Sequence, residues 1–420
     1  MSLHLLRTLI FLIISMLLFS GTTLAHEKIT EIGYLSQSDL TPVKIFHQGG
    51  NANNAAWSPH GDLLMTWMRD PNLVGVTNVQ VWNVVNNVNL QTLEHSVGIV
   101  SAVWSPDQSY VLTATYDDRI HVWNVETGLE TQTMAHDDRV GGVLWDKVAK
   151  QILSWSNDAT ARLWDSETGQ EVHQWKHKGA VVGAIFSPDE NRVLTWSADG
   201  IVMEWDRQSG EEVLRYSHDG QVYNAMWSPD GNRIMSVGND LSVRVVDSRS
   251  GEEIHKLHIP STEAGARWNH DGSLIMAHAD QNYVIVWDAM TGNRVFDINV
   301  PRAISIRDVV WTPSESQIGV ISLDMVWVYD SKFGAWDYTF PHKSDVRSAV
   351  WSADGVFVLT QTIDGKAHLW EAARAELISD LTHPDRNIRF VAWHPDNVQF
   401  VTVSRDGTIN IWQAPTQVSR

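Results

Sequence analysis

The sequence predicts an all-β protein, organised as a single array of short strands with a repeat near forty residues. Two observations predict it. Within one unit, strand-like runs of four to six residues alternate with turn-forming residues, as in an antiparallel meander of four strands. Between units, the same residue types return at the same distances. The clearest unit supplies the runs Val140–Trp145, Gln151–Trp155, Ala161–Trp164 and Glu171–Trp175, which we call strands a, b, c and d.

Each unit has an aromatic anchor at the end of strand a. From Trp145, a histidine lies nine residues before, a hydroxyl residue nine after, an aspartate thirteen after and a second tryptophan nineteen after. Four units keep all four offsets. Their members are His95, Thr113, Asp117 and Trp123; His136, Ser154, Asp158 and Trp164; His177, Thr195, Asp199 and Trp205; and His342, Thr360, Asp364 and Trp370.

These units resemble the WD-repeat β-propeller family, in a form typical of secreted bacterial members. The shared motifs are W-D at 164–165 and 287–288, S-P-D-G at 228–231, and T-G at 127–128 and 168–169. The resemblance implies a structural relay in which the indole N–H meets the hydroxyl, the hydroxyl meets the histidine, and the histidine meets the aspartate. Buried polar groups of these types need partners, and each such bond contributes about 1 kcal/mol.

The repeat count predicts one closed ring. The nine anchors are spaced 40 to 47 residues apart and lie at Trp57, Trp104, Trp145, Phe186, Trp227, Trp268, Trp311, Trp351 and Trp393. A strand d precedes each anchor, beginning with Val43–His47, whereas the chain ends after the ninth strand c. We therefore expect a single closed β-propeller of nine four-stranded antiparallel blades, in which the N-terminal strand completes the last blade. The alternative is eight blades with one degenerate unit packed elsewhere.

The other units depart from this pattern, the last one least, since it keeps Thr402, Asp406 and Trp412 and has His383 one place early. The first keeps His47 but inserts six residues between Asp70 and Trp82. In the fifth, Val246 replaces the relay tryptophan, and in the sixth, Ala277 replaces the hydroxyl residue. In the seventh, Arg302, Val320 and Tyr329 replace histidine, serine and tryptophan. We expect the fifth to seventh blades to be the softer part of the ring.

The N-terminal sequence predicts an exported protein. Met1–Ala25 has the pattern of a cleavable signal peptide, with Arg7, the apolar run Leu9–Phe19 and a small-residue cleavage site ending at Ala25. This favours a secreted or periplasmic location, with an uncleaved anchor as the alternative. Residues 26–42 are expected to be a linker or strap, 43–415 the propeller and 416–420 a tail. The chain has no Cys, so disulfides are excluded.

Charge and histidine placement narrow the function. The net charge is −19, which argues against nucleic-acid binding. Eight of the 18 histidines fall at or beside relay positions, one per blade, so we expect no metal site and no cofactor. The sequence has no nucleophile elbow, phosphate-binding glycine loop or H-E-x-x-H motif.

Two classes of function remain. The preferred one is a monomeric, non-catalytic interaction scaffold of the cell envelope or exterior, which docks a protein or peptide. The alternative is a hydrolase or small-ligand binder with a site in the central funnel, because some propellers carry catalytic acids there. A narrower possibility is an envelope accessory propeller of the translocation-associated kind, which shares W-S-P-D-G turns.

The resemblance also indicates a binding surface. The d–a and b–c connections share one face, which we call the top face. In the family, the residue four before each anchor and the residue before each relay aspartate commonly contact ligands. Transferred here, these positions include Arg69, Tyr116, Tyr223, Arg307, Arg347, Arg389 and Arg405. The five arginines come from consecutive units of a closed ring. We expect them to dock an acidic peptide or carboxylate ligand, unless they merely pair with neighbouring acids.

Overall fold

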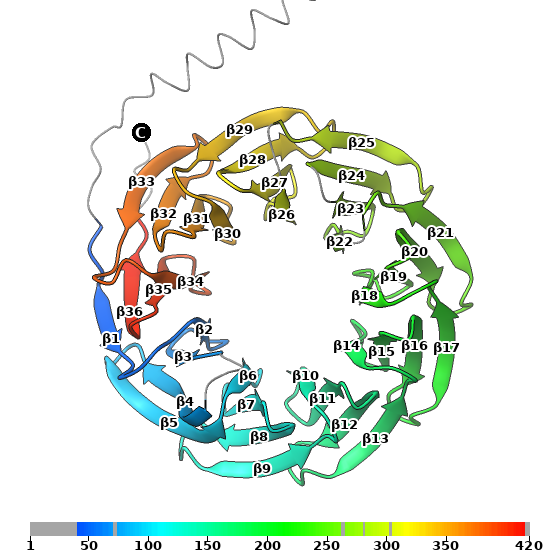
Figure 1. The fold of residues 1–420 in the computed structure, drawn as a ribbon, viewed down its shortest axis with the longest axis horizontal. Coiled ribbons are helices and arrows are strands. Elements are labelled where there is room, and N and C mark those ends of the chain that lie inside the picture. The colour runs from blue at the N-terminus through cyan, green and yellow to red at the C-terminus, as the bar shows by residue number, and fades with distance from the viewer. Residues whose placement is uncertain (1–39, 70–73, 262–264, 280–281, 302–304, 416–420) are drawn as a thin grey trace, which may run out of the picture. The chain divides into compact units, whose positions relative to one another are not determined.

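The computed structural model describes residues 40–69, 74–261, 265–279, 282–301 and 305–415. These residues form 36 strands in nine four-stranded antiparallel sheets and no helix. The sheets stand as blades around a central opening (Figure 1). The predicted signal peptide, most of the predicted linker and the C-terminal tail lie outside the described residues.

The first five blades each contain four strands that follow one another in sequence. Their bounds are β2 (Asn54–Trp57), β3 (Leu63–Trp67), β4 (Val74–Asn83) and β5 (Val88–Val97); β6 (Ile99–Trp104), β7 (Tyr110–Thr115), β8 (Arg119–Asn124) and β9 (Glu130–Ala135); β10 (Val140–Trp145), β11 (Gln151–Ser156), β12 (Thr160–Asp165) and β13 (Glu171–Lys176); β14 (Val181–Phe186), β15 (Arg192–Ser197), β16 (Ile201–Asp206) and β17 (Glu212–Ser217); and β18 (Val222–Trp227), β19 (Arg233–Gly238), β20 (Ser242–Asp247) and β21 (Glu253–His258).

Blades 6 to 8 follow the same order, and blade 9 takes its fourth strand from the N-terminal part of the chain. The bounds are β22 (Gly265–Trp268), β23 (Leu274–Ala279), β24 (Tyr283–Asp288) and β25 (Arg294–Asn299); β26 (Ile306–Trp311), β27 (Gln317–Ser322), β28 (Met325–Asp330) and β29 (Trp336–Pro341); β30 (Val346–Trp351), β31 (Phe357–Thr362), β32 (Ala367–Glu371) and β33 (Glu376–Leu381); and β34 (Ile388–Trp393), β35 (Gln399–Ser404), β36 (Thr408–Gln413) and β1 (Lys44–His47).

The predicted closure and the count of nine blades are confirmed. Strand β1 pairs antiparallel with β36, from Lys44 opposite Ile411 to His47 opposite Thr408. The side chain of Phe46 is 4% exposed, and its ring centroid lies 5.1 Å from that of Trp82 in blade 1. The N-terminal strand therefore completes blade 9 and packs against the next blade.

The hydrophobic core lies mainly in the seams between neighbouring blades. Each cluster combines strands of two blades: one contains Met235 and Val245 of blade 5 together with Ile275 and Trp287 of blade 6. The anchor indoles of Trp104 and Trp393 also donate hydrogen bonds of 3.0 Å to backbone carbonyls of the preceding blade. The sheet of a single blade is thus covered only when both neighbours are present.

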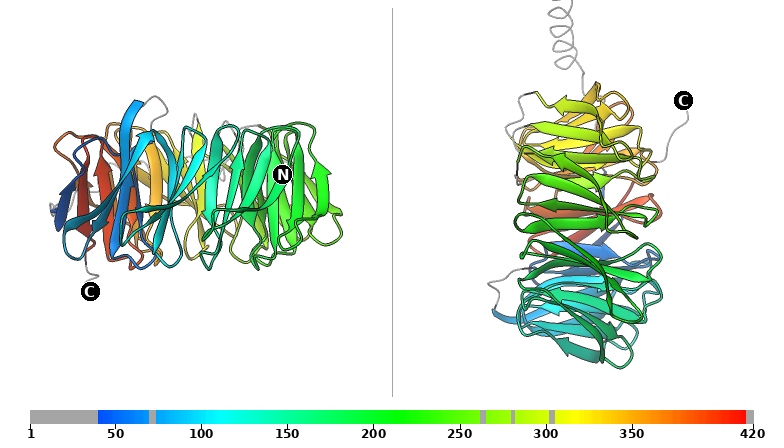
Figure 2. Two further views of the ribbon diagram at one scale, coloured as in Figure 1. Left: turned by 90° about the horizontal axis from the view of Figure 1, so that it is seen from below. Right: turned by 90° about the vertical axis from the view of Figure 1, so that its right-hand side faces the viewer.

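The insertion in the first unit lengthens the outer hairpin of blade 1. Strands β4 and β5 have ten residues each and pair from Val74 opposite Val97 to Asn83 opposite Val88. The open end of this hairpin, at Val74 and Val97, rises above one face of the ring (Figure 2). That face carries the b–c turns and is therefore the top face. The described residues contain no helix long and apolar enough to cross a membrane.

Ring closure gives the first testable prediction. Deleting residues 26–47 removes β1, leaves β36 with an unpaired edge and uncovers the seam around Phe46. We expect this variant to aggregate or to melt at a much lower temperature than the parent protein. Deleting residues 26–38 leaves β1 in place and should have little effect. Thermal unfolding followed by circular dichroism checks both, and equal melting temperatures would contradict the closed-ring assignment.

Candidate functional site

The predicted relay is complete in blade 3. The Trp164 indole donates a 2.8 Å hydrogen bond to the Ser154 hydroxyl, which lies 2.8 Å from Nε2 of His136. Nδ1 of His136 lies 2.8 Å from a carboxylate oxygen of Asp158. Burial opposes ionisation of Asp158, but hydrogen bonds from Thr160, the Asp137 N–H and His136 outweigh it and lower its pKa to about 2. Every polar group in this chain of bonds is satisfied.

In blades 2, 4 and 8 the first two steps of the relay are present. Trp123, Trp205 and Trp370 donate to Thr113, Thr195 and Thr360 over 2.9–3.0 Å, and Nε2 of His95, His177 and His342 lies 2.7–2.8 Å from the same hydroxyls.

The predicted histidine–aspartate step differs between these blades. In blade 2, Asp117 accepts a hydrogen bond from Thr115 over 2.5 Å, and His95 instead places Nδ1 3.1 Å from the Leu93 carbonyl. In blade 8, Asp364 similarly accepts from Thr362 over 2.6 Å. The cause is a threonine two residues before the aspartate, which holds the carboxylate within its own turn. Blade 4 is intermediate: Asp199 lies 3.5 Å from Nδ1 of His177 and accepts from the Lys178 N–H.

In blades 1 and 5, other side chains replace relay members. In blade 1, Thr66 bonds to Gln48 rather than to His47, so the prediction for His47 is wrong by one residue. His47 lies instead 3.4 Å from the Thr408 hydroxyl. In blade 5, the Tyr216 hydroxyl donates to Ser236 over 3.0 Å and so replaces the missing tryptophan. In blade 7, the Tyr329 hydroxyl is buried and has no partner among the described residues.

The difference between blades 3 and 7 predicts opposite effects of losing one polar group. Changing Trp164→Phe removes the donor to Ser154 inside a buried relay, so we expect a loss of about 1–3 kcal/mol in the free energy of unfolding. Changing Tyr329→Phe removes a buried hydroxyl that lacks a described partner, and should be neutral or stabilising. Urea denaturation of both variants checks the order, and a larger loss for Tyr329→Phe would contradict the relay.

The relay histidines also make stability depend on pH. Burial lowers the pKa of His95 to about 4, of His342 to about 3 and of His383 to about 4, in the first two cases with help from the neighbouring His121 and His368. An unfolded histidine titrates near 6.5, so between about pH 4 and 6.5 the unfolded chain binds more protons than the folded one. The free energy of unfolding must then rise with pH across this window.

We therefore expect the fold to lose stability as the pH falls from 6.5 to 4. The shift at His95 alone corresponds to about 3 kcal/mol. Changing His95→Gln, which copies the Gln48 arrangement of blade 1, should reduce the slope of stability against pH. Denaturation midpoints measured from pH 4 to 7 test this. A slope that is unchanged in the variant would contradict the assignment to buried neutral histidines.

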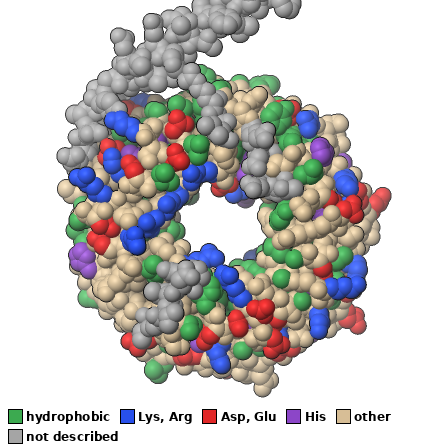
Figure 3. All heavy atoms as spheres, viewed as in Figure 1, with side chains coloured by type: hydrophobic (Ala, Val, Ile, Leu, Met, Phe, Trp, Pro, Cys, Tyr) green, Lys and Arg blue, Asp and Glu red, His purple; other side chains and the backbone are tan. Residues whose placement is uncertain are grey.

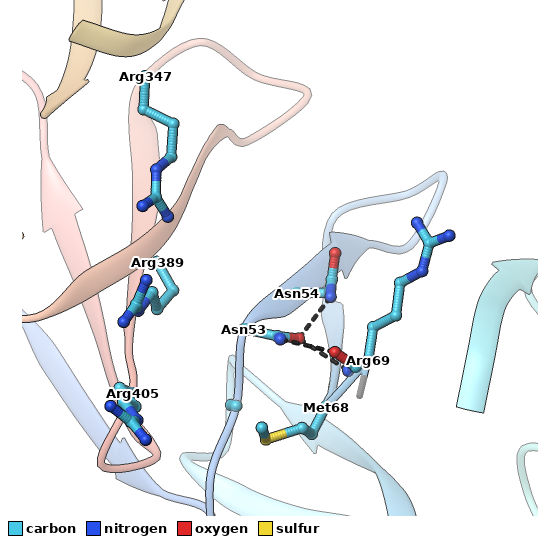
Figure 4. A pocket seen from close by; sticks show the side chains of 8 residues that line it. Asn53, Asn54, Met68, Arg69, Arg347, Arg389 and Arg405 are labelled. Atoms are coloured by element: carbon cyan, nitrogen blue, oxygen red, sulfur yellow. Dashed lines mark hydrogen bonds between the residues drawn. The ribbon is translucent and has the colours of Figure 1, made fainter. Parts of the chain in front are cut away.

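Four of the five predicted arginines line one pocket on the top face. Its volume is about 450 Å³ and its lining consists of Ala52, Asn53, Asn54, Met68, Arg69, Arg347, Arg389 and Arg405. Arg347, Arg389 and Arg405 follow one another along one wall, and Arg69 lies on the other (Figure 4). We call this the arginine pocket. It spans blades 8, 9 and 1, and Lys and Arg side chains mark the rim of the central opening over β30 and β34 (Figure 3).

Two of these arginines lie in β-bulges, one in β30 and one in β34. Arg347 lies between Val346, opposite Thr362, and Ser348, opposite Gln361, so it has no residue opposite it in the ladder. Arg389 occupies the same place in β34, between Ile388 and Phe390. Bulged residues leave the regular pleat and re-aim their side chains. The same register shift recurs in strand a of seven blades, at Val100, Gly141, Val182, Tyr223, Arg307, Arg347 and Arg389.

The fifth arginine has a different environment. Arg307 donates to Asp345 of the next blade over 3.4 Å and does not line the pocket. Within the described part of the chain, no ion pair involves Arg69, Arg347, Arg389 or Arg405. Burial lowers the pKa of Arg347, and the positive charges of Arg389 and Arg307 lower it further. The arginine pocket therefore concentrates positive charge that the surrounding described residues do not neutralise.

The two predicted tyrosines lie away from the arginine pocket. Tyr116 of blade 2 stacks under the guanidinium of Arg139, which lies 4.9 Å from its ring centroid. Tyr223 of blade 5 donates a 2.8 Å hydrogen bond to Asn239. Tyr116 lies in the b–c turn of its blade and Tyr223 near the start of β18, both toward the top face, but neither lines the pocket.

Two asparagines also line the pocket: Asn53, which lies four residues before its anchor Trp57, and Asn54, which sequence reasoning did not select. The Asn53 side chain accepts a hydrogen bond from the Arg69 N–H over 2.8 Å and donates one to the Arg69 carbonyl over 2.9 Å. Asn54 donates to Asn53. These bonds hold the b–c turn of blade 1 against the start of β2, and only the three-dimensional pairing of the two segments reveals them.

A second pocket lies in the a–b turns of blades 4 and 5, on the face opposite the arginine pocket. It measures about 360 Å³ and has a mixed lining that includes Asp189, Asp230, Arg192 and Arg249. Both carboxylates are already bonded within their own turns, to Ser187 and to Ser228. Over the described ranges, no group of three or more histidine or acidic side chains is placed to hold a metal ion.

Comparisons with known proteins agree with this architecture. The family model for the WD domain, G-beta repeat, matches residues 336–371 and 375–413. The model described as outer membrane protein assembly factor BamB matches 134–314, and that described as eukaryotic translation initiation factor eIF2A matches 34–130. No curated protein matches the chain. The crystal structure of the computationally designed Ika8 protein is similar, with a TM-score of 0.60 and 21% identity over 77% of this chain and 99% of that chain. This likeness shows the fold alone.

Proposed function

Because the chain belongs to the WD-repeat β-propellers, we propose that it is a non-catalytic scaffold of the cell envelope or exterior, which docks a protein or peptide on its top face. Propellers of this family generally act as protein-interaction scaffolds. The rigid ring holds the connections of several blades at fixed positions around one opening (Figure 1). A partner that contacts several blades at once would meet a preorganised surface, which lowers the entropy lost on binding.

The arginine pocket is the observation that carries this proposal. A cation that is neutralised within the fold adds little to binding, whereas these four arginines have no acid partner among the described residues. Arg347, moreover, is held beside two further cations, which disfavour its charged form. An anionic group from a partner would relieve this repulsion, so the charge arrangement of the top face favours docking there.

The proposed location rests on two separate observations. The N-terminal pattern of Arg7, the apolar run Leu9–Phe19 and the small residues before Ala25 predicts export. The middle of the chain, residues 134–314, matches a family model named for an outer membrane protein assembly factor. Both support a protein that works in the envelope or outside the cell.

The test is affinity capture from envelope extract, with bound proteins identified by mass spectrometry. We expect the parent protein to retain a partner that the double variant Arg347→Ala, Arg389→Ala releases. We also expect the parent to retain less of that partner at high salt than at low salt. Changing Arg249→Ala, on the opposite face, provides a control with a single lost charge. A partner set that both arginine variants retain equally, at both salt concentrations, would place the docking surface elsewhere.

A further inference from the structure

We infer that the arginine pocket binds an acidic segment of a partner chain through more than one carboxylate at a time. This inference rests on the proposed function and names the chemistry of the partner. Arg69, Arg347, Arg389 and Arg405 line a single pocket of about 450 Å³, and no acidic residue is among its described lining residues. The chain as a whole is strongly acidic, with a net charge of −19, so this local excess of cations is not a general property of the surface.

The positive charge of the pocket has an explanation in the repeat: an aspartate that pairs with an arginine at one blade junction is replaced by an asparagine at the next. Asp345 precedes β30 by one residue and pairs with Arg307 of blade 7. Asn387 precedes β34 by one residue and so occupies the equivalent position in blade 9, one blade after Arg347. The two positions are equivalent in the backbone as well. The carbonyl of Asp345 accepts from the Ile363 N–H over 2.8 Å, and that of Asn387 accepts from the Arg405 N–H over 3.0 Å.

The same substitution is present one blade further on. Asp345, Asn387 and Asn51 all lie six residues before their anchors, Trp351, Trp393 and Trp57. An uncharged amide therefore stands where an aspartate would neutralise Arg347 or Arg389. At Arg307, by contrast, the fold supplies its own carboxylate. A carboxylate that pairs with the arginines of blades 8 and 9 would therefore come from another molecule.

The number and arrangement of the arginines favour an acidic peptide over a single anion. One carboxylate has two oxygens with about four acceptor sites, so two bidentate guanidiniums are enough to fill them. Four guanidiniums from three blades can therefore accommodate several carboxylates. Arg347, Arg389 and Arg405 line one wall in succession and Arg69 lies opposite, so the pocket suits an elongated occupant (Figure 4). The net charge of −19 disfavours a nucleic acid, whose binding needs a wide basic footprint.

The direct test uses a fluorescein-labelled hexaglutamate peptide as the probe and measures its fluorescence anisotropy with the full chain. We expect saturable binding that weakens with salt, and no binding of labelled hexaglutamine. The double variant Arg347→Ala, Arg389→Ala should bind at least about tenfold more weakly, because hydrogen bonds to charged groups are lost. Circular dichroism melting of the same samples shows whether the ring remains folded.

Two single substitutions test the missing acid without removing any arginine. Changing Asn387→Asp should neutralise Arg347 within the fold, as Asp345 neutralises Arg307, and should weaken hexaglutamate binding while the melting temperature is kept. Changing Asp345→Asn frees Arg307, whose charge acts on Arg347 although Arg307 does not line the pocket, and should strengthen binding. Asn86→Asp adds the same charge at the exposed β4–β5 turn on the opposite face and should leave the affinity unchanged.

Defined outcomes would overturn the inference. It fails if hexaglutamate does not bind the parent protein, or if Asn387→Asp and Asn86→Asp have equal effects. It also fails if inorganic phosphate or a short single-stranded DNA displaces the peptide at a lower concentration of negative charge than unlabelled hexaglutamate does. Should an envelope partner still depend on Arg347 and Arg389 while hexaglutamate does not bind, the docking function stands and only its acidic chemistry is wrong.

Discussion

The ring depends on the pairing of β1 with β36. This ladder joins residues that are about 360 positions apart in the chain, as in the contact between His47 and Thr408. Every other blade is completed by strands adjacent in sequence, so its sheet forms from local contacts. The final contact closes a long loop, which costs entropy, and it is stabilised by burial of Phe46 against blades 9 and 1. Without it, both end blades would expose apolar seams.

The relay in the blades and the arginines of the top face differ in whether the fold itself supplies partners for their polar groups. In blade 3, buried hydroxyl, imidazole and indole groups satisfy one another through the bonds that join Trp164, Ser154 and His136. On the top face, the fold brings four arginines together and supplies no described acid to them. The rigidity that the interior bonds provide keeps the arginines in place despite their mutual repulsion, because the backbone that carries them is fixed by packing on both sides of each blade.

Much of this arrangement could be predicted from the sequence, because residues at the same offset in each repeat occupy the same place in each blade. The count of nine blades, the role of Val43–His47 and the placement of the arginines on neighbouring blades all follow from regular spacing. Departures from the repeat could not be predicted in this way. The Thr115 hydroxyl competes for Asp117, and Gln48 rather than His47 meets Thr66. Spacing alone does not decide such local competitions between nearby hydrogen-bonding groups.

The bulge in strand a has a consequence for how the recognition surface can change over time. In seven blades one residue near the top of this strand stands outside the ladder, with no residue opposite it. Its side chain contributes little to the pairing of its own blade, and the chain indeed carries glycine, valine, tyrosine and arginine there. Where this residue is exposed, as at Tyr223 and Arg347, mutation can therefore alter it without weakening the ring. Val100 is buried in the core and a side chain at Gly141 would meet Trp155, so these two positions are constrained. Single substitutions at exposed bulge positions can therefore change what the protein binds while its fold stays the same.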